Sequence, residues 1–242
     1  MTRPVVPVRL AAAAALGLMI LSGCADVPAG PAREGLITVT PTPIATPSSA
    51  SEIRDQMMTA VHESQSVRVK GTLTRSGSST VLDLTANRLG QTRGTVTRDG
   101  MTIDVVRDDQ VIYVRAPDSY WAASQPALLP AASGKWVRAP LADSRFAELS
   151  SLLAFDQVVT APLSNLNDVK LGSTTFFESD QVIEMSTATG SVFVQATGMP
   201  LPVAVVDSAV GDLRYTEWGA AVPQPTPSWV DVLDVFPRAT TS

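Results

Sequence analysis

Apolar and polar residues alternate along much of the chain, beginning at Val67. An alternation of period two places every second side chain on the same face of a β-strand. The first series of such runs covers residues 67–74, 79–86, 94–98, 101–107 and 110–116. Asp99-Gly100 and Asp108-Asp109 lie between runs and are typical of hairpin turns. The pattern predicts an antiparallel meander of about five strands.

A second series of short β-rich runs comes later in the chain, over residues 168–176, 181–187, 191–196, 202–208 and 213–219. Thr189-Gly190 marks a further turn between two of these runs. The two series together predict ten short antiparallel strands. A sheet of that size is large enough to curl.

Helical spacing occurs before and between the two series. Ser49 and Glu52 form a capping-box pattern, in which each side chain satisfies a backbone amide at a helix start. The amphipathic helix that begins there is expected to end near Ser66, with an apolar stripe made of Ile53, Met57, Ala60 and Val61. Residues 117–140 are expected to form a Trp- and Pro-bearing connection, and residues 141–155 return to helical spacing.

The C-terminal tail has an ambiguous pattern. Its apolar residues come after a possible cap at Ser228, and their spacing favours a short closing helix and a strand equally; they are Trp229, Val232, Leu233 and Phe236. Antiparallel strands with helices before and between them predict an α+β fold.

The N-terminal residues have the pattern of an export signal. Arg3 and Arg9 supply a positive start, and Leu10–Leu21 is an uncharged apolar run too short to span a bilayer. The run ends in Leu21-Ser22-Gly23-Cys24, which resembles a bacterial lipobox. In that pattern the signal is cut before Cys24, whose thiol carries the lipid. An ordinary signal peptide or an inert buried thiol is the alternative, and the position of Cys24 favours the lipobox.

The expected organisation has three parts. Residues 1–23 are the lipoprotein signal peptide, and residues 24–50 are the lipidated Cys24 with a tether rich in Pro, Thr and Ser. Residues 51–242 form a single domain, because neither a repeat nor a second linker interrupts them. Two acyl chains on Cys24 would anchor the mature protein durably to a membrane.

Composition narrows the function. The chain of 242 residues is 45% hydrophobic, with one Cys and one His, which excludes an intrachain disulfide and disfavours zinc, Ser-His-Asp and Cys-His chemistry. A net charge of -5 leaves no basic surplus for nucleic acid. His62 is expected to be a solvated helical residue, and Asp108-Asp109 a turn, since no further oxygen ligands come after it. We therefore expect no cofactor, no metal and no enzymatic activity, with an unrecognised hydrolase as a weaker alternative.

The layout resembles the LolA-like lipoproteins of actinobacteria, the group that contains the mycobacterial LprG and LppX types. Besides the lipobox, the tether and the first helix, the resemblance rests on Val111–Val114 followed by Tyr120-Trp121, on Gly134–Val137, on the helix with Phe146, Leu149, Leu152 and Leu153, and on Tyr215–Gly219. It implies a half-barrel, in which a strongly curved antiparallel sheet wraps helices and encloses an apolar cavity. A departure is the Ala- and Pro-rich insert at residues 122–133, which affects the expected shape of the cavity mouth.

The resemblance also implies a function: members bind acyl chains or glycolipids and are implicated in moving them across the cell envelope. We therefore expect a lipoprotein on the extracytoplasmic face of the cell membrane, with an acyl lipid or glycolipid as ligand and an envelope transporter as a possible partner. The alternative is an accessory or regulatory interaction module of an envelope transporter or enzyme, with the same fold and a filled cavity.

Alternating positions in the strands and one face of the second helix supply the candidate cavity lining. The candidates are Val67, Val69, Leu73, Leu82, Leu84, Ile103, Val105, Ile112, Val114, Phe146, Leu149 and Leu153. Alternation shows which residues share a face, but a face that encloses space has the same pattern as one that packs a core. Both interpretations therefore stay open at this point.

The anchor is tested by the substitution Cys24→Ala. Without the thiol no acyl chain can be attached, so the variant is expected to lose partitioning into the detergent phase in a Triton X-114 extraction, where the unaltered protein is retained. Equal partitioning of the variant would contradict the lipobox assignment.

Overall fold

The computed structural model describes residues 49–164, 166, 168–220 and 226–236. These ranges include every strand and both helical segments that the sequence pattern predicts. The predicted signal peptide, Cys24 and nearly all of the tether lie outside the described residues.

Two runs of strands build one sheet. The first run contains β1 (Ser66–Arg75), β2 (Ser78–Asn87), β3 (Thr92–Arg98), β4 (Met101–Arg107), β5 (Val111–Arg115) and β6 (Trp136–Pro140). The second contains β7 (Lys170–Phe177), β8 (Asp180–Ser186), β9 (Gly190–Gln195), β10 (Pro202–Asp207), β11 (Gly211–Thr216) and the short β12 (Val232–Asp234). Within the described residues, the twelve strands have the order β12-β6-β5-β4-β3-β2-β1-β11-β10-β9-β8-β7.

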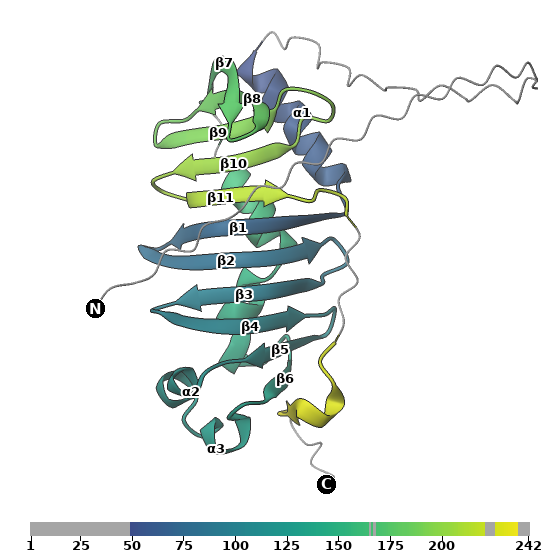
Figure 1. The fold of residues 1–242 in the computed structure, drawn as a ribbon, viewed down its shortest axis with the longest axis vertical. Helices are drawn as coiled ribbons and strands as arrows, with labels where there is room; N and C mark the ends of the chain where they lie inside the picture. The colour runs from purple at the N-terminus through teal and green to yellow at the C-terminus, as the bar shows by residue number, and fades with distance from the viewer. Residues whose placement is uncertain (1–48, 165, 167, 221–225, 237–242) are drawn as a thin grey trace, which may run out of the picture. The chain divides into compact units, whose positions relative to one another are not determined.

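Pairing of β1 with β11 joins the two meanders into a continuous sheet (Figure 1). In the register of β1, Val69 lies opposite Leu84 on one side and Tyr215 on the other. All neighbouring strands are antiparallel except β12 and β6, which are parallel. The predicted meanders are confirmed, as is the Asp99-Gly100 turn, where both residues have the positive φ of a tight hairpin.

The expected number of ten strands was too low. β6 lies in the segment that the sequence pattern assigned to a connection; it ends in Pro140, and proline argues against a strand. For the C-terminal tail the sequence left a helix and a strand open, and the structure has both: the turn η4 (Trp229–Asp231) and then β12, which pairs with β6. Two short helices, α2 (Asp118–Ser124) and α3 (Leu129–Ala132), also form within this connection.

The first helix is confirmed. In α1 (Ala50–Glu63) the Ser49 hydroxyl accepts a hydrogen bond from the backbone N–H of Glu52 at 3.2 Å, as expected for an N-cap. The residues of the predicted apolar stripe are all buried; they are Ile53, Met57, Ala60 and Val61. The backbone becomes extended at Ser64, which ends the helix slightly before the expected residue.

The second helical segment is longer and less regular than expected. It starts with the single turn η1 (Ser144–Phe146) and α4 (Ala147–Leu152), and continues as the π-turn η2 (Asp156–Thr160) and the 3-10 turn η3 (Ala161–Leu163). The sequence pattern placed its end at residue 155. Val158 and Val159, which come after that residue, are β-branched and weak helix formers. Both valines are fully buried, so tertiary packing outweighs their local preference.

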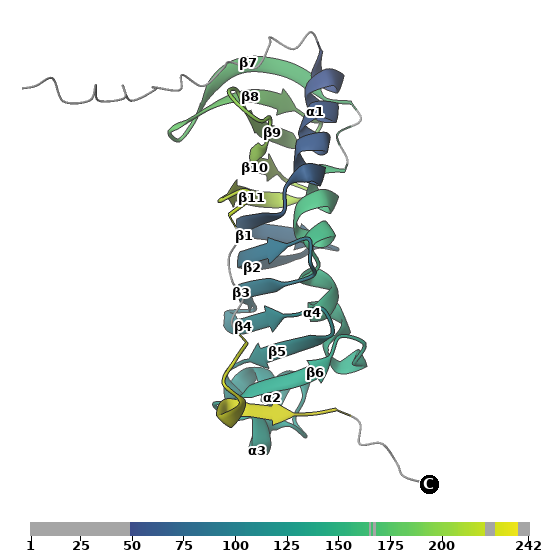
Figure 2. The same ribbon diagram turned by 90° about the vertical axis from the view of Figure 1, so that its right-hand side faces the viewer.

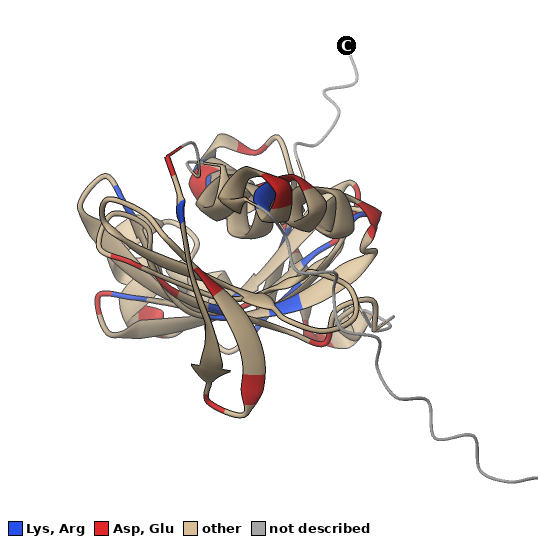
Figure 3. Ribbon diagram, turned by 90° about the horizontal axis from the view of Figure 1, so that it is seen from above, with Lys and Arg blue, Asp and Glu red and all other residues tan. Residues whose placement is uncertain are grey.

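Both helical segments lie on the same face of the sheet (Figure 2). Seen along the stack of strands, the sheet bends around them (Figure 3). The sheet is not closed, because β7 and β12 end it on either side. The structure therefore confirms the predicted α+β fold with a strongly curved, mostly antiparallel sheet around helices.

Two glycines permit close strand approach in this sheet. At Gly94 in β3 the φ angle is 148°, and a Cβ would lie within van der Waals overlap of the Asp83 carbonyl oxygen in β2. Gly71 in β1 makes the same kind of approach to the Asp212 carbonyl in β11. Glycines inside strands commonly mark such bends and close backbone contacts.

Arginine side chains fasten the helices to the sheet. Arg88 donates to the carbonyls of Val61 at 2.8 Å and Ser64 at 3.0 Å, at the C-terminus of α1. Arg107 at the end of β4 donates to the Ser150 carbonyl of α4 at 3.0 Å. Burial lowers the pKa of Arg107, but the guanidinium stays charged at neutral pH because the ordinary pKa of arginine is far above 7. These bonds satisfy carbonyl groups that helix ends leave unpaired.

Candidate functional site

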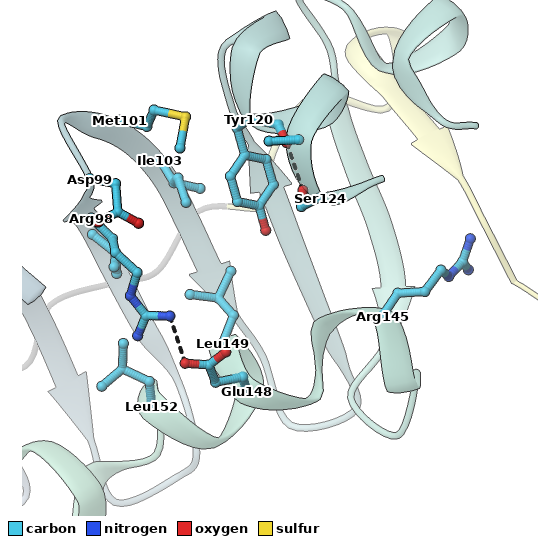
Figure 4. Close-up of a pocket in the computed structure, with 12 residues that line it drawn as sticks. Arg98, Asp99, Met101, Ile103, Tyr120, Ser124, Arg145, Glu148, Leu149 and Leu152 are labelled. Carbon is cyan, nitrogen blue, oxygen red and sulfur yellow. Dashed lines mark hydrogen bonds and ion pairs between the residues drawn. The ribbon is translucent and has the colours of Figure 1, made fainter. Parts of the chain in front are cut away.

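A pocket of about 330 Å³ lies between the β3–β4 hairpin and the helices α2 and α4 (Figure 4). It is lined by Val96, Arg98, Asp99, Met101, Ile103, Tyr120, Ala123, Ser124, Arg145, Glu148, Leu149 and Leu152. The hairpin forms one wall and the two helices form the others, so the site is assembled from three separate stretches of the chain.

The inner walls are apolar. Val96 of β3 and Ile103 of β4 are cross-strand partners, and both side chains are nearly fully buried. Leu149 and Leu152 of α4 face them from the helix side (Figure 4). Met101 adds a flexible thioether beside the hairpin turn. A ligand in this space would therefore meet mainly hydrocarbon.

Charged groups gather at the rim. Nη1 of Arg98 lies 2.6 Å from Oε1 of Glu148, so this ion pair joins β3 to α4 across the pocket. Nε of Arg98 also donates to the Thr80 hydroxyl at 3.3 Å. Asp99, in the adjoining hairpin turn, adds a second carboxylate. Because the pair is largely exposed to solvent, it contributes little to stability, and it can exchange partners at low cost.

Tyr120 supplies a neutral polar group at the pocket. Its hydroxyl is directed into the space between the hairpin and α4 (Figure 4). Burial raises the pKa of this phenol, so it stays protonated at neutral pH. The next residue fixes α2 in place: Trp121 is fully buried, and its Nε1 donates to the Ala116 carbonyl at 3.1 Å.

Arg145 lines the pocket, yet its charge is directed elsewhere. Its guanidinium pairs with Asp143 at 2.6 Å and donates to the Val235 carbonyl at 3.1 Å, and Figure 4 shows the side chain turned away from the pocket. The hydrogen bonds from Arg145 lower the pKa of Asp143. The cation that faces the rim is therefore that of Arg98.

The predicted cavity residues divide into two groups. Ile103 and Leu149 line the pocket. The other ten pack into the main hydrophobic core between sheet and helices; they are Val67, Val69, Leu73, Leu82, Leu84, Val105, Ile112, Val114, Phe146 and Leu153. Those ten side chains are at most 3% exposed. The pocket lies at the hairpin end of β3 and β4, which are the fifth and fourth strands from the β12 edge.

Sequence reasoning did not single out several residues of the pocket. Val96 and Met101 lie in strands that were predicted, but neither was chosen as a candidate. Tyr120 and Leu152 belong to the residues on which the family resemblance rested, and that was the signal available for them. Ala123 and Ser124 lie on α2, within the insert that departs from the family layout, and they line this pocket.

A smaller pocket of about 240 Å³ lies near the ends of β9 and β10. Its most buried polar residue is Asp207, whose carboxylate accepts bonds from the hydroxyls of Thr187 at 3.0 Å and Thr189 at 2.6 Å. It also accepts from the backbone N–H groups of Ala209 at 2.8 Å and Val210 at 3.3 Å. This carboxylate is saturated by donors that hold turns together. Across the described residues, no group of three or more His, Cys, Asp or Glu side chains could hold a metal ion.

Comparison with known proteins identifies the fold. No protein-family model and no curated protein matches the sequence. Among solved structures, LprF from Mycobacterium bovis matches over 75% of this chain and 100% of its own, with a TM-score of 0.50 and 13% identity. The chain has the LprF fold. The Mycobacterium tuberculosis lipoprotein LppX is also similar, over 73% of this chain and 100% of its own, with a TM-score of 0.47 and 15% identity.

The match to LprF confirms, at the level of the fold, the resemblance to mycobacterial LolA-like lipoproteins that the sequence indicated. At this identity the LprF fold shows the arrangement of sheet and helices and leaves the ligand open. Among the described helices, none is long and apolar enough to cross a membrane.

The role of Asp207 is tested by Asp207→Asn. Burial alone would raise the pKa of this carboxyl, but the hydrogen bonds from Thr189, Ala209, Thr187 and Val210 lower it overall. The ionised carboxylate therefore contributes stability above its ordinary pKa, and this contribution is lost as the pH falls through the lowered folded-state pKa. The variant is expected to reduce the free energy of unfolding by about 1–3 kcal/mol at pH 7.

Urea denaturation at pH 7 and at acid pH measures this effect, with Asp212→Asn as the control, since Asp212 is exposed on the neighbouring strand β11. The difference between Asp207→Asn and the unaltered protein should shrink at acid pH, while the control stays close to the unaltered protein throughout. A pH-independent difference would contradict the proposed role of the charge.

Proposed function

We propose that this protein is a membrane-anchored lipoprotein that binds the acyl chain of a lipid or lipoglycan and carries or chaperones it in the cell envelope. The observation that carries the proposal is the pocket between the β3–β4 hairpin, α2 and α4, with apolar walls and a polar rim. The LprF fold supports it, because a curved open sheet under helices offers room for an apolar ligand.

The size of the pocket favours one acyl chain. Its volume of about 330 Å³ lies at the lower end of the range for small-molecule sites, roughly 300–1,000 Å³. Each buried methylene contributes about 0.8 kcal/mol, so ten methylenes would contribute on the order of 8 kcal/mol before the costs of binding. Hydrophobic burial alone can therefore hold such a ligand, and no bond needs to be made or broken.

The rim indicates how the ligand is oriented. With the chain against Val96, Ile103 and Leu149, the polar headgroup would lie beside Arg98 and Glu148, where solvent can reach it. The Tyr120 hydroxyl can donate a hydrogen bond to an ester or carboxyl oxygen near the mouth. The proposed anchor is the acylated Cys24, which would place the protein on the extracytoplasmic face of the membrane.

A second candidate function is an accessory or regulatory interaction module of an envelope transporter or enzyme. The observation in its favour is the filled core, since ten of the candidate cavity residues pack together. In that case the fold would present surfaces to a protein partner and hold no lipid.

Ligand binding in the pocket is tested by Ala123→Trp. Ala123 lines the pocket from α2, so a Trp side chain there is expected to occupy the mouth. Loss of two or more buried methylenes corresponds to an affinity at least tenfold weaker. The measurement is a fluorescence titration with a long-chain fluorescent fatty acid below its micelle concentration. The matched control is Ala127→Trp, because Ala127 is exposed between α2 and α3 and lies outside the pocket lining.

Native mass spectrometry of the protein purified from its own kind of envelope separates the two functions. Carrier function predicts a co-purifying acyl species that Ala123→Trp removes and Ala127→Trp retains. Stoichiometric recovery of a transporter subunit without any acyl species would favour the interaction module and contradict the carrier.

A further inference from the structure

An uncharged surface lies directly beside the pocket mouth. From Ser119 to Gly134 the chain has no charged residue, and this stretch contains all of α3 and all of α2 except its first residue, the exposed Asp118. Much of it is exposed to solvent; the exposed residues include Ala122, Ala123, Pro126, Ala127, Pro130 and Ala131. Each of the two helices has one fully buried side chain that fixes it to the core, Trp121 in α2 and Ala132 in α3.

A second exposed apolar group lies at the same end of the sheet. Trp229 is 83% exposed and Val230 is 63% exposed, and both lie on the turn η4 (Trp229–Asp231) immediately before β12. Since β12 pairs with β6, and α3 leads into β6, the two groups flank the same edge of the sheet (Figures 1 and 2). We call residues 119–134 together with Trp229 and Val230 the end surface.

The end surface has the chemistry of a membrane contact. Tryptophan concentrates at the interface between bilayer and water, and exposed apolar groups can enter that region. The end surface itself carries no charge, and the exposed Asp118, Lys135 and Asp231 stand next to it in the chain. Exposed apolar groups on soluble domains mark sites of protein or membrane interaction. The direct connection with the pocket favours the membrane, because Tyr120, Ala123 and Ser124 of the end surface are also pocket residues.

The proposed anchor is long enough to allow this contact. About 25 residues separate Cys24 from Ser49, which at about 3.1 Å per residue can reach roughly 75 Å. Twelve strands at about 4.8 Å spacing extend over roughly 50 Å. Although α1 lies nearer the β7 edge of the sheet, the anchored chain can therefore reach a bilayer with its opposite edge (Figure 2).

We propose that the end surface docks on the lipid bilayer and brings the mouth of the pocket against it, so that an acyl chain passes between membrane and pocket without crossing water. The transfer of an acyl chain rests on the proposed function, but the contact between the end surface and the bilayer can be measured without it. The bilayer contact is made by Trp229 and Val230 on one side and by the exposed residues of α2 and α3 on the other.

The test is binding to vesicles of phosphatidylcholine, with and without phosphatidylglycerol, using the chain from residue 24 with Cys24→Ser so that no acyl anchor contributes. The expected result is co-sedimentation that falls at least tenfold when Trp229→Ser and Ala127→Asp are combined. Both residues are exposed, so neither change removes a core contact. The matched control is Phe176→Ser, which removes an aromatic ring that is 70% exposed on β7, at the other edge of the sheet.

A second measurement reports insertion directly. Vesicles that contain brominated phosphatidylcholine should quench part of the tryptophan emission, and Trp229→Phe should remove most of that quenching. Of the other three tryptophans, Trp121 is fully buried and Trp136 and Trp218 are half-buried. Any of four results would overturn the docking proposal. The starting protein does not bind vesicles, the double variant binds them as well as the starting protein does, Phe176→Ser loses as much binding as the double variant, or Trp229→Phe leaves the quenching unchanged.

Titration of the same proteins with the soluble fluorescent fatty acid distinguishes the two proposals. The double variant should keep the affinity of its pocket for this probe while it loses vesicle binding. If vesicle binding behaves as expected but the starting protein does not bind the probe, the end surface stands as a membrane contact and the proposed carrier function fails.

Discussion

Everything in this structure depends on burying one face of a wide, open sheet. Twelve strands joined through the β1–β11 pair present more apolar surface than α1 and the segment from α4 to η3 can cover unless the sheet bends toward them. Close strand approach at Gly71 and Gly94 permits that bend. Arg88 and Arg107 then fix the helices by bonding their unpaired carbonyl groups. The result is a core that is filled over most of its length.

The pocket lies where this cover passes from one helix to the next. The β3–β4 hairpin lies beneath α4. Beside α4, the short helix α2 covers the sheet, and its buried Trp121 fixes it in place. Between the two helices Val96 and Ile103 remain facing a space that no side chain fills. Polar atoms of Arg98, Glu148 and Tyr120 surround the opening. An amphiphile could therefore place its apolar chain in the pocket and its polar headgroup at these atoms. The proposed carrier function therefore rests on a pocket that the helices leave uncovered.

Much of this arrangement can be predicted from the sequence, and some of it cannot. Alternation predicted both meanders, and the Ser49 cap predicted the start of α1. β6 was missed because it lies among prolines and short helices, and the choice between helix and strand in the tail depends on the pairing of β12 with β6, which is a tertiary contact. The candidate lining residues, among them Val69 and Leu84, pack in one core cluster with residues of the helices, and their role in binding a ligand stays a prediction. Which of these residues line a pocket depends on where the helices end, and the alternation within the strands does not predict those ends.

The central claim is that the acyl chain lies between the β3–β4 hairpin, α2 and α4. Photo-crosslinking with a diazirine-bearing fatty acid, followed by peptide mass spectrometry, tests it most directly. The account predicts adducts on the pocket residues Met101, Tyr120, Leu149 and Leu152. Adducts on the core beneath α1, at Met57 or Val69, would show that the ligand displaces the filled core and would contradict the account.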